Sequence, residues 1–293
     1  MFRVVQGGGI LLLTIVLSGC SENSQQAGQS ADDTSRTRQS LTSTAPHAPQ
    51  ISANKSSRDQ TWSQEYKLKE YPGGAFALAD PGSPPTGDAA AVIKSLETIA
   101  KSGNSKASFE IYQKIQECLD IIQNQDGTEQ ISTGYEKHKK EASNRCKNLS
   151  TDDYARASEW LELAATQGSL PAQLIYSTNI SASLGGDAAD YIRDPDGVAN
   201  YKERAITFLN NASKMGSIDA LGILSDYYQN GVMVEQNSSI SYAYLAAIAK
   251  AAPDLTPKRQ MNILERSLSP SEITEARRKA EEIFNECCNQ RTR

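Results

Sequence analysis

A helical pattern that recurs along the second half of the chain is the feature that most restricts its fold. The pattern opens at Ala157 and again at Ala205, and the later positions of the two copies match one for one. Its aromatic anchor moves 48 residues from Trp160 to Phe208, and 36 residues from Phe208 to Tyr244, where a third copy begins. Periods of this size are typical of helical solenoids, in which successive helix pairs stack on one another. The repeat therefore predicts an all-α fold built from helix pairs.

The residue types of the repeat explain why each copy would form two helices. Alanine at four-residue spacing lets a second helix approach closely, and a glycine ends the first helix of each pair. We expect these positions to be structural. They are Trp160, Ala164, Gly168 and Ala172 in one copy, and Phe208, Ala212, Gly216, Ala220, Leu224, Tyr228 and Gly231 in the next.

These residues resemble the Sel1-like repeats, which are relatives of the tetratricopeptide repeats. The copy from Ala205 to Val234 matches the family pattern best, and it departs from that pattern at Ser225 and Met233, where the family favours glycine. The resemblance implies a solenoid of Sel1-like repeats. For function it implies only that the protein binds other proteins.

The first clear copy matches the family pattern only in its front half and then carries an insertion near residues 184–197. This insertion contains Asp187, Asp190, Asp194 and Asp196, which raises the possibility of a calcium site. The alternating ligand spacing of an EF-hand loop is absent. A plain acidic loop at the entry to a helix is the better interpretation.

The N-terminus predicts export and attachment to a membrane. Residues 1–19 combine a basic start with an apolar run that is too short to span a bilayer, which is typical of a signal peptide. The segment Leu17-Ser18-Gly19-Cys20 resembles the lipobox of bacterial lipoproteins, in which the cysteine is lipidated and becomes the first mature residue. An ordinary export signal with an incidental cysteine is the alternative. By the same resemblance, the presence of Ser21 instead of aspartate favours the outer membrane.

Residues 20–85 are predicted to form a long disordered tether. Ser, Gln, Thr, Ala and Pro dominate this stretch, and such a composition buries too little apolar surface to offset the entropy of ordering. An aromatic patch near its end, made of Trp62, Tyr66, Tyr71 and Phe76, either packs on the folded domain or binds a partner. We favour packing.

Residues 86–293 are predicted to form the helical domain. Degenerate helices occupy 88–149, the repeats 150–252, and C-terminal capping helices 256–288. Cys118 and Cys146 lie on two helices at similar distances from the turn that joins them, so we expect a disulfide between them in an oxidising compartment. Adjacent Cys287 and Cys288 could stay free, link two chains, bind a metal or close a strained ring, and the residues leave this choice open.

Composition and motifs exclude several classes of function. A formal net charge of −5 gives no reason to expect a nucleic-acid partner, and only two histidines, His47 and His138, are present. The sequence offers no catalytic constellation, metal site or cofactor motif, and we expect a protein that is not an enzyme.

Three interpretations of the function remain. We expect a lipid-anchored scaffold or adaptor in the bacterial cell envelope, facing the periplasm and holding a protein partner. The alternative is a glycan-binding or peptidoglycan-enzyme accessory protein, with Tyr191, Tyr227 and Tyr242 as candidate stacking surfaces. An unrecognised hydrolase is the third.

Overall fold

A computed structural model of the chain describes residues 62, 65–123, 133–186 and 188–289. All of them belong to one compact unit that spans residues 52–293, and the preceding unit contains none of them. The expected signal peptide, the predicted lipidation site Cys20 and most of the expected tether lie outside the described residues. None of the described helices combines the length and the apolar character that a bilayer crossing requires.

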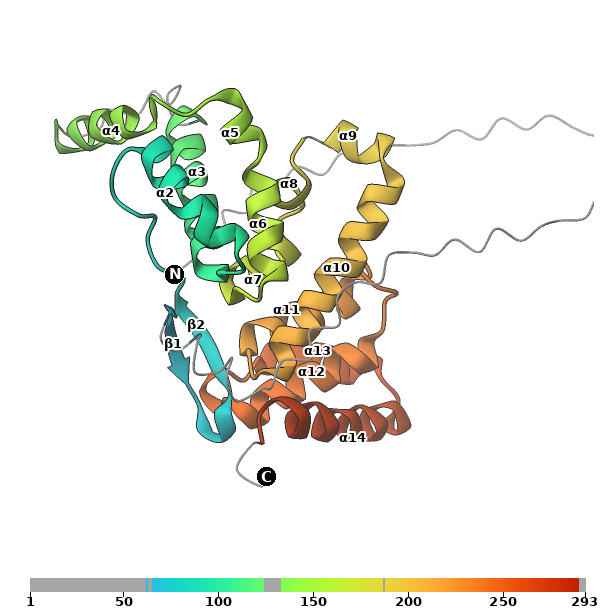
Figure 1. Ribbon diagram of the computed structural model, residues 1–293. Coiled ribbons are helices and arrows are strands. Elements are labelled where there is room, and N and C mark those ends of the chain that lie inside the picture. The colour runs from blue at the N-terminus through green and yellow to red at the C-terminus, as the bar shows by residue number, and fades with distance from the viewer. Residues whose placement is uncertain (1–61, 63–64, 124–132, 187, 290–293) are drawn as a thin grey trace, which may run out of the picture. The chain divides into compact units, whose positions relative to one another are not determined.

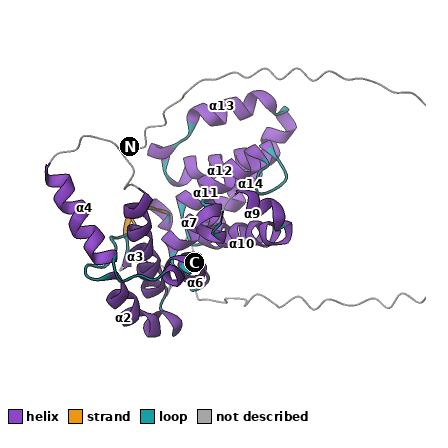
Figure 2. Ribbon diagram, turned by 90° about the horizontal axis from the view of Figure 1, so that it is seen from above, coloured by secondary structure: helices purple, strands orange, loops and turns teal. Residues whose placement is uncertain are grey.

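Helices make up nearly all regular structure in the described part of the chain (Figure 1, Figure 2). The pairs α2–α3, α6–α7 and α10–α11, followed by α12 and α14, pack in succession, which confirms the predicted all-α helical solenoid. In chain order the helices are α2 (Ala89–Lys101), α3 (Ser105–Gln123), α4 (Thr133–Cys146), α5 (Thr151–Ala155), α6 (Ala157–Thr166), α7 (Leu170–Thr178), α8 (Ile180–Leu184), α9 (Ala188–Arg193), α10 (Pro195–Lys214), α11 (Ile218–Asn230), α12 (Ser238–Ala251), α13 (Lys258–Ser267) and α14 (Pro270–Cys287).

Local sequence signals set many of these helix ends. Ser150 and Ser269 each form a capping box, in which the serine hydroxyl accepts from a backbone N–H three residues on and an acidic side chain returns the interaction. Arg156 interrupts the helical stretch that follows Ser150 and separates α5 from α6. Caps thus locate helix starts well, whereas the break inside a helical pattern has no local signal.

The stretch after α7, which includes the insertion at residues 184–197, is largely helical, so the prediction of a plain loop in the insertion is wrong. Asn179 accepts a hydrogen bond from the backbone N–H of Ala182 and starts α8, and Asp194 accepts from that of Gly197 and starts α10. Asp190 pairs with Arg193 at 3.0 Å within α9. Asp187 lies outside the described residues. The described acidic residues therefore include a helix cap and an ion-pair partner.

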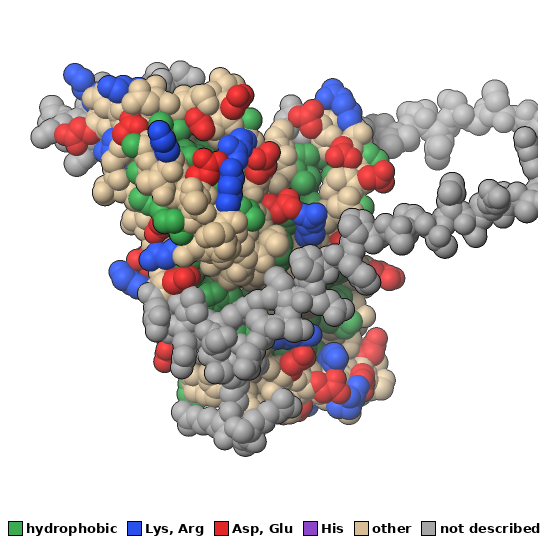
Figure 3. All heavy atoms as spheres, viewed as in Figure 1, with side chains coloured by type: hydrophobic (Ala, Val, Ile, Leu, Met, Phe, Trp, Pro, Cys, Tyr) green, Lys and Arg blue, Asp and Glu red, His purple; other side chains and the backbone are tan. Residues whose placement is uncertain are grey.

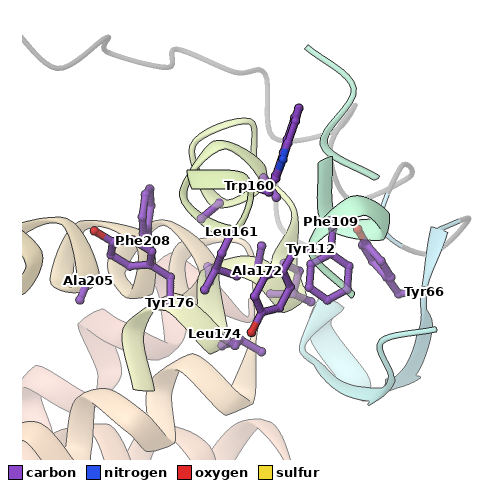
Figure 4. Close-up of a cluster of buried hydrophobic side chains, with 14 of the residues drawn as sticks. Tyr66, Phe109, Tyr112, Trp160, Leu161, Ala172, Leu174, Tyr176, Ala205 and Phe208 are labelled. Atoms are coloured by element: carbon purple, nitrogen blue, oxygen red, sulfur yellow. The ribbon is translucent and has the colours of Figure 1, made fainter. Parts of the chain in front are cut away.

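The main core forms where helices of successive pairs meet (Figure 4). Tyr176 of α7 lies between two aromatic rings of α10, with its centroid 5.5 Å from Tyr201 and 5.1 Å from Phe208. Trp160 and Leu161 of α6 are buried in the same cluster. One helix pair exposes an apolar face that only its neighbour can cover, and stacking therefore holds the array together.

Serine replaces the glycine of the family pattern at equivalent positions in two copies, Ser177 and Ser225. The Ser177 hydroxyl lies 3.0 Å from the backbone oxygen of Ala205, and the Ser225 hydroxyl lies 3.1 Å from that of Ser241. Both acceptors sit at the matching position of the next copy, and both serines are buried. The Ser177 hydroxyl also lies 2.8 Å from the backbone oxygen of Gln173 in its own helix, so its single proton is shared between two acceptors. The departure from the pattern therefore places a hydroxyl within hydrogen-bond distance of the next helix pair in both copies.

The prediction of a disordered tether is wrong at the C-terminal end of residues 20–85, because this part of the chain forms regular structure. Strands β1 (Lys67–Glu70) and β2 (Phe76–Asp80) form an antiparallel hairpin around the short helix η1 (Pro72–Gly74). Trp62, Tyr66 and Phe76 are buried, which confirms that the aromatic patch packs on the helical domain. Burying these large rings offsets the ordering entropy that the average composition of the segment cannot offset.

The four described cysteines form two pairs. Cys118 of α3 and Cys146 of α4 are bonded, with their Cα atoms 5.6 Å apart, and the bond closes a loop of 28 residues. Cys287 and Cys288 are bonded to each other at the end of α14, and both are buried. Of the alternatives that the sequence leaves open for Cys287 and Cys288, the structure therefore adopts the ring closed by a disulfide between them.

Candidate interaction site

The signature residues of the repeat lie in the interior or at turns of the helical array. Trp160, Phe208, Leu224 and all the signature alanines are buried, and Tyr228 is half-buried with its ring stacked on Tyr244 at 5.9 Å. Gly231 ends α11 with φ +69. These residues position the helices, and the surfaces that can meet a partner must be sought elsewhere.

The N-terminal strap, defined as Trp62 and residues 65–80, occupies one edge of the array. This edge consists of the turns that join the two helices of each pair, and the glycine of each turn has a positive φ, +96 at Gly168 and +108 at Gly216. The indole Nε1 of Trp62 donates to the backbone oxygen of Gly168 at 2.7 Å, and the backbone N–H of Phe76 donates to that of Gly216 at 2.9 Å. The strap thus satisfies the same backbone acceptor in two successive repeats.

The residues that follow these two glycines bind the strap as well. The hydroxyls of Tyr66 and Ser169 lie 3.0 Å apart, and the backbone N–H of Leu78 donates to Asp219 Oδ2 at 2.8 Å. Burial raises the pKa of the Asp219 carboxyl, and the bond from Leu78 partly opposes that effect. The contact is therefore made by backbone and side-chain groups together.

The strap also contacts the helices on either side of these two repeats. Glu65 lies half-buried near Lys106 at the start of α3, and burial raises the pKa of its carboxyl. At the other end, Lys69 pairs with Asp254 at 2.8 Å, just after α12. Gly73 packs so closely on the end of α14 that a Cβ there would lie 2.1 Å from the backbone oxygen of Cys288. The strap therefore runs along the turn edge from the first helix pair to the end of α14.

Those helix surfaces that lie away from the turn edge carry interspersed charges of both signs (Figure 3). Glu97 of α2 accepts from Lys101 at 2.6 Å and lies 4.0 Å from Arg156, which also pairs with Glu159 of α6 at 3.1 Å. The guanidinium of Arg156 lies 5.3 Å from the ring centroid of Trp160. A further ion pair, Arg204 with Glu162, joins α10 to α6. The side chains of these pairs are partly exposed, and exposed pairs of this kind add little stability.

The tyrosines that the sequence singles out as stacking surfaces already have partners within the domain. Tyr242 is buried and its hydroxyl donates to Glu265. The half-buried Tyr227 donates to the backbone oxygen of Ser177, and burial raises the pKa of its hydroxyl to about 12. The Tyr191 hydroxyl lies 3.2 Å from the backbone oxygen of Gly186. Their packing therefore gives no specific support to a carbohydrate platform.

In the part of the chain that the structure describes, no three His, Cys, Asp or Glu side chains gather as a metal site would require. Among the described residues, the groups with raised pKa values include tyrosines that are buried or half-buried, such as Tyr227, and the carboxyls of Glu65 in the strap and Asp219 beside it. They also include cations such as Arg278, which is held by carboxylates. Each of these shifts has a structural cause, so none of them marks a catalytic centre by itself.

The strap is the feature that the sequence interpretation missed. Its signal was present, because four aromatic residues interrupt a polar stretch between Trp62 and Phe76. Nothing local indicates that their partners are the turn glycines, since Trp62 and Gly168 are 106 residues apart.

No protein-family profile matches this chain, and no curated protein is significantly similar to it. Among solved structures, it is similar to a protective antigen present in uropathogenic Escherichia coli strains, whose structure displays an SLR fold. The two sequences are 16% identical, and the match covers 66% of this chain and 48% of the other, with a TM-score of 0.29. This chain thus spans about half the length of that neighbour. A TM-score this low carries no argument about function.

Proposed function

We propose that this protein is a lipid-anchored, non-enzymatic scaffold of the bacterial cell envelope, and that its array of Sel1-like helix pairs holds a protein partner. In this proposal Cys20 carries the lipid, the residues that follow form the tether, and the domain faces the periplasm. The residue after the cysteine, Ser21, favours the outer membrane.

The strap is the observation that supports this function best. It is an extended polypeptide that binds the array through backbone groups and buried aromatic rings, at equivalent positions of two repeats. The array thus has a surface of the kind that binds polypeptide. Because the strap already occupies the turn edge, an external partner would bind the faces of α2, α6 and α10, whose charged side chains are partly exposed among the described residues.

The chemistry of those open faces suits a protein more than a small ligand. Alternating carboxylates and guanidinium groups extend from Glu97 through Arg156 and Glu162 to Arg204, and most are partly exposed. Charges arranged in this way fix the register of a protein partner and contribute to specificity more than to affinity.

Site-specific photocrosslinking in intact cells tests the scaffold. A photoreactive amino acid replaces Glu159 on α6 or Glu203 on α10, both of which are exposed, and the control position is the exposed Asn285 on α14. We expect a discrete protein adduct from the first two positions and none from the third. Equal labelling at all three positions, or adducts with peptidoglycan alone, would contradict the proposal.

Two further measurements test the other parts of the proposal. Cys20→Ala should release the protein from membranes into the soluble periplasmic fraction, and an unprocessed protein that stays with membranes would count against lipidation. Turnover of muropeptides by the purified protein would establish a hydrolase instead of a scaffold.

A further inference from the structure

Helix α13 presents an outer face on which basic and apolar side chains alternate. Arg259, Ile263 and Arg266 are all exposed, and their spacing of four and three residues places them on one side of the helix. The opposite side is anchored by Leu264, which is buried in the core shared by α12 and α14. Ile263 is 52% exposed, and Leu255, just before the helix, is 41% exposed.

The cations of α13 differ from those of its neighbour α14 in having no carboxylate partner among the described residues. On α14, Arg278 pairs with Glu275 and Glu282, and Lys279 lies 3.1 Å from Glu282. Among the ion pairs of the described residues, none involves Lys258, Arg259 or Arg266 of α13.

The single acidic residue of α13 does not neutralise this face. Glu265 accepts a hydrogen bond from the Tyr242 hydroxyl of α12 and lies 3.5 Å from Arg277 of α14, so it is directed toward the array. The charged side chains on the outer face of α13 are therefore all basic, although the whole chain carries a net charge of −5.

An anionic bilayer surface matches this combination of groups. Exposed isoleucine and leucine can enter the boundary between headgroups and acyl chains, while flanking arginines meet lipid phosphates. If the chain is anchored through Cys20, as proposed above, a bilayer is always present at high local concentration. An acidic protein surface would satisfy the arginines equally well, but it would not by itself explain the exposed Ile263 between them.

We propose that the outer face of α13, with Arg259, Ile263 and Arg266, is a membrane-contact surface that binds anionic phospholipid. This inference rests on the proposed anchoring only for the local concentration of lipid. The contact would hold the array against the bilayer, so that the partner-binding faces of α6 and α10 are presented in a restricted orientation.

Fluorescence quenching by brominated lipids tests the contact. The full chain with Ile263→Trp is mixed with brominated phosphatidylcholine vesicles, with or without phosphatidylglycerol; Trp62 and Trp160 are buried and supply a constant background. A matched control places the new tryptophan at Ile192, which is 82% exposed but lies beside Asp190 and Asp194. We expect quenching at position 263 that requires phosphatidylglycerol, and little quenching at position 192.

Charge variants then identify the groups responsible. In the Ile263→Trp background, Arg259→Gln with Arg266→Gln should raise the anionic lipid needed for half-maximal quenching about 25-fold, because each basic side chain contributes about fivefold. The control pair Arg278→Gln with Lys279→Gln removes the same charge from α14, where both cations are paired, and should change little.

The anchor and the α13 contact can fail separately in this assay. Flotation of the whole chain with neutral vesicles reports the anchor, whereas position-specific quenching reports α13. Absence of quenching at position 263, equal quenching in neutral vesicles, or equal effects of the two charge variants would overturn the proposal for α13.

Discussion

Gly168 and Gly216 offer a matched pair of substitutions that measures how firmly the strap is held. They occupy the same position in two repeats, end the first helix of each pair, and have φ values of +96 and +108. Replacing either glycine by alanine must strain the backbone, because residues with an L side chain rarely adopt such φ values. The two positions differ in their contact with the strap.

The structure allows the two costs to be separated. A Cβ at Gly168 would meet nothing within 4 Å, so Gly168→Ala should cost only the backbone strain, about 1–3 kcal/mol. A Cβ at Gly216 would lie 2.6 Å from the backbone oxygen of Gly74 in the strap. The hairpin must then move, which weakens the bond between Phe76 and Gly216, worth about 1 kcal/mol, and exposes part of the buried Phe76 ring, worth up to about 2–3 kcal/mol. Gly216→Ala should therefore cost about 1–4 kcal/mol more than Gly168→Ala.

Urea unfolding gives the two free energies, and hydrogen exchange shows where the difference arises. The amide of Phe76 donates to Gly216, and that of Leu78 donates to Asp219, so both should be protected in the wild-type protein. Their exchange should speed up in Gly216→Ala and stay close to wild type in Gly168→Ala. Equal destabilisation by the two variants, with unchanged exchange at Phe76, would refute the packing of the strap described above.

Three further predictions concern the disulfide, the buried acid and the tyrosine contacts. Replacing Cys118 and Cys146 together by serine should lower the free energy of unfolding by about 3–4 kcal/mol, because their bond closes a 28-residue loop, and urea unfolding measures this. Burial raises the pKa of Asp219, so the folded state binds its proton more tightly than the unfolded state; the resulting stability is present at low pH and is lost as the pH rises through the folded pKa. Asp219→Asn should remove this dependence from melting temperatures recorded above pH 4, and an unchanged pH profile would argue against it. Tyr227→Phe removes the hydroxyl that donates to Ser177 and should cost about 1 kcal/mol in urea unfolding, whereas a neutral effect would show that the bond contributes nothing.

The helical part of the fold could be predicted well because its signals are local. Glycine stops at Gly168 and Gly216, together with the serine caps Ser150 and Ser269, place helix ends by interactions within a few residues. The periodic alanines then indicate which helix faces meet. The break at Arg156 and the short helices α8 and α9 escaped prediction, because propensity alone does not determine where a helical stretch is interrupted.

The candidate surfaces could be predicted only in part. The aromatic patch was recognised, and packing was favoured, but the segment around it was assigned to a disordered tether because its average composition is polar. The basic face of α13 follows from its sequence, yet the direction of Glu265 toward Tyr242 does not. Whether a charge is neutralised depends on the helices packed beside it.

The sequence by itself determined that the chain forms a series of helix pairs, because periodicity, caps and glycine stops act between neighbours along the chain. Only the tertiary structure decided where the strap lies and which arginines have no carboxylate partner in the described part of the chain. Those features depend on contacts between distant segments, such as Trp62 with Gly168 across 106 residues. Such contacts are set by the geometry of the stacked array, and no short stretch of sequence encodes them.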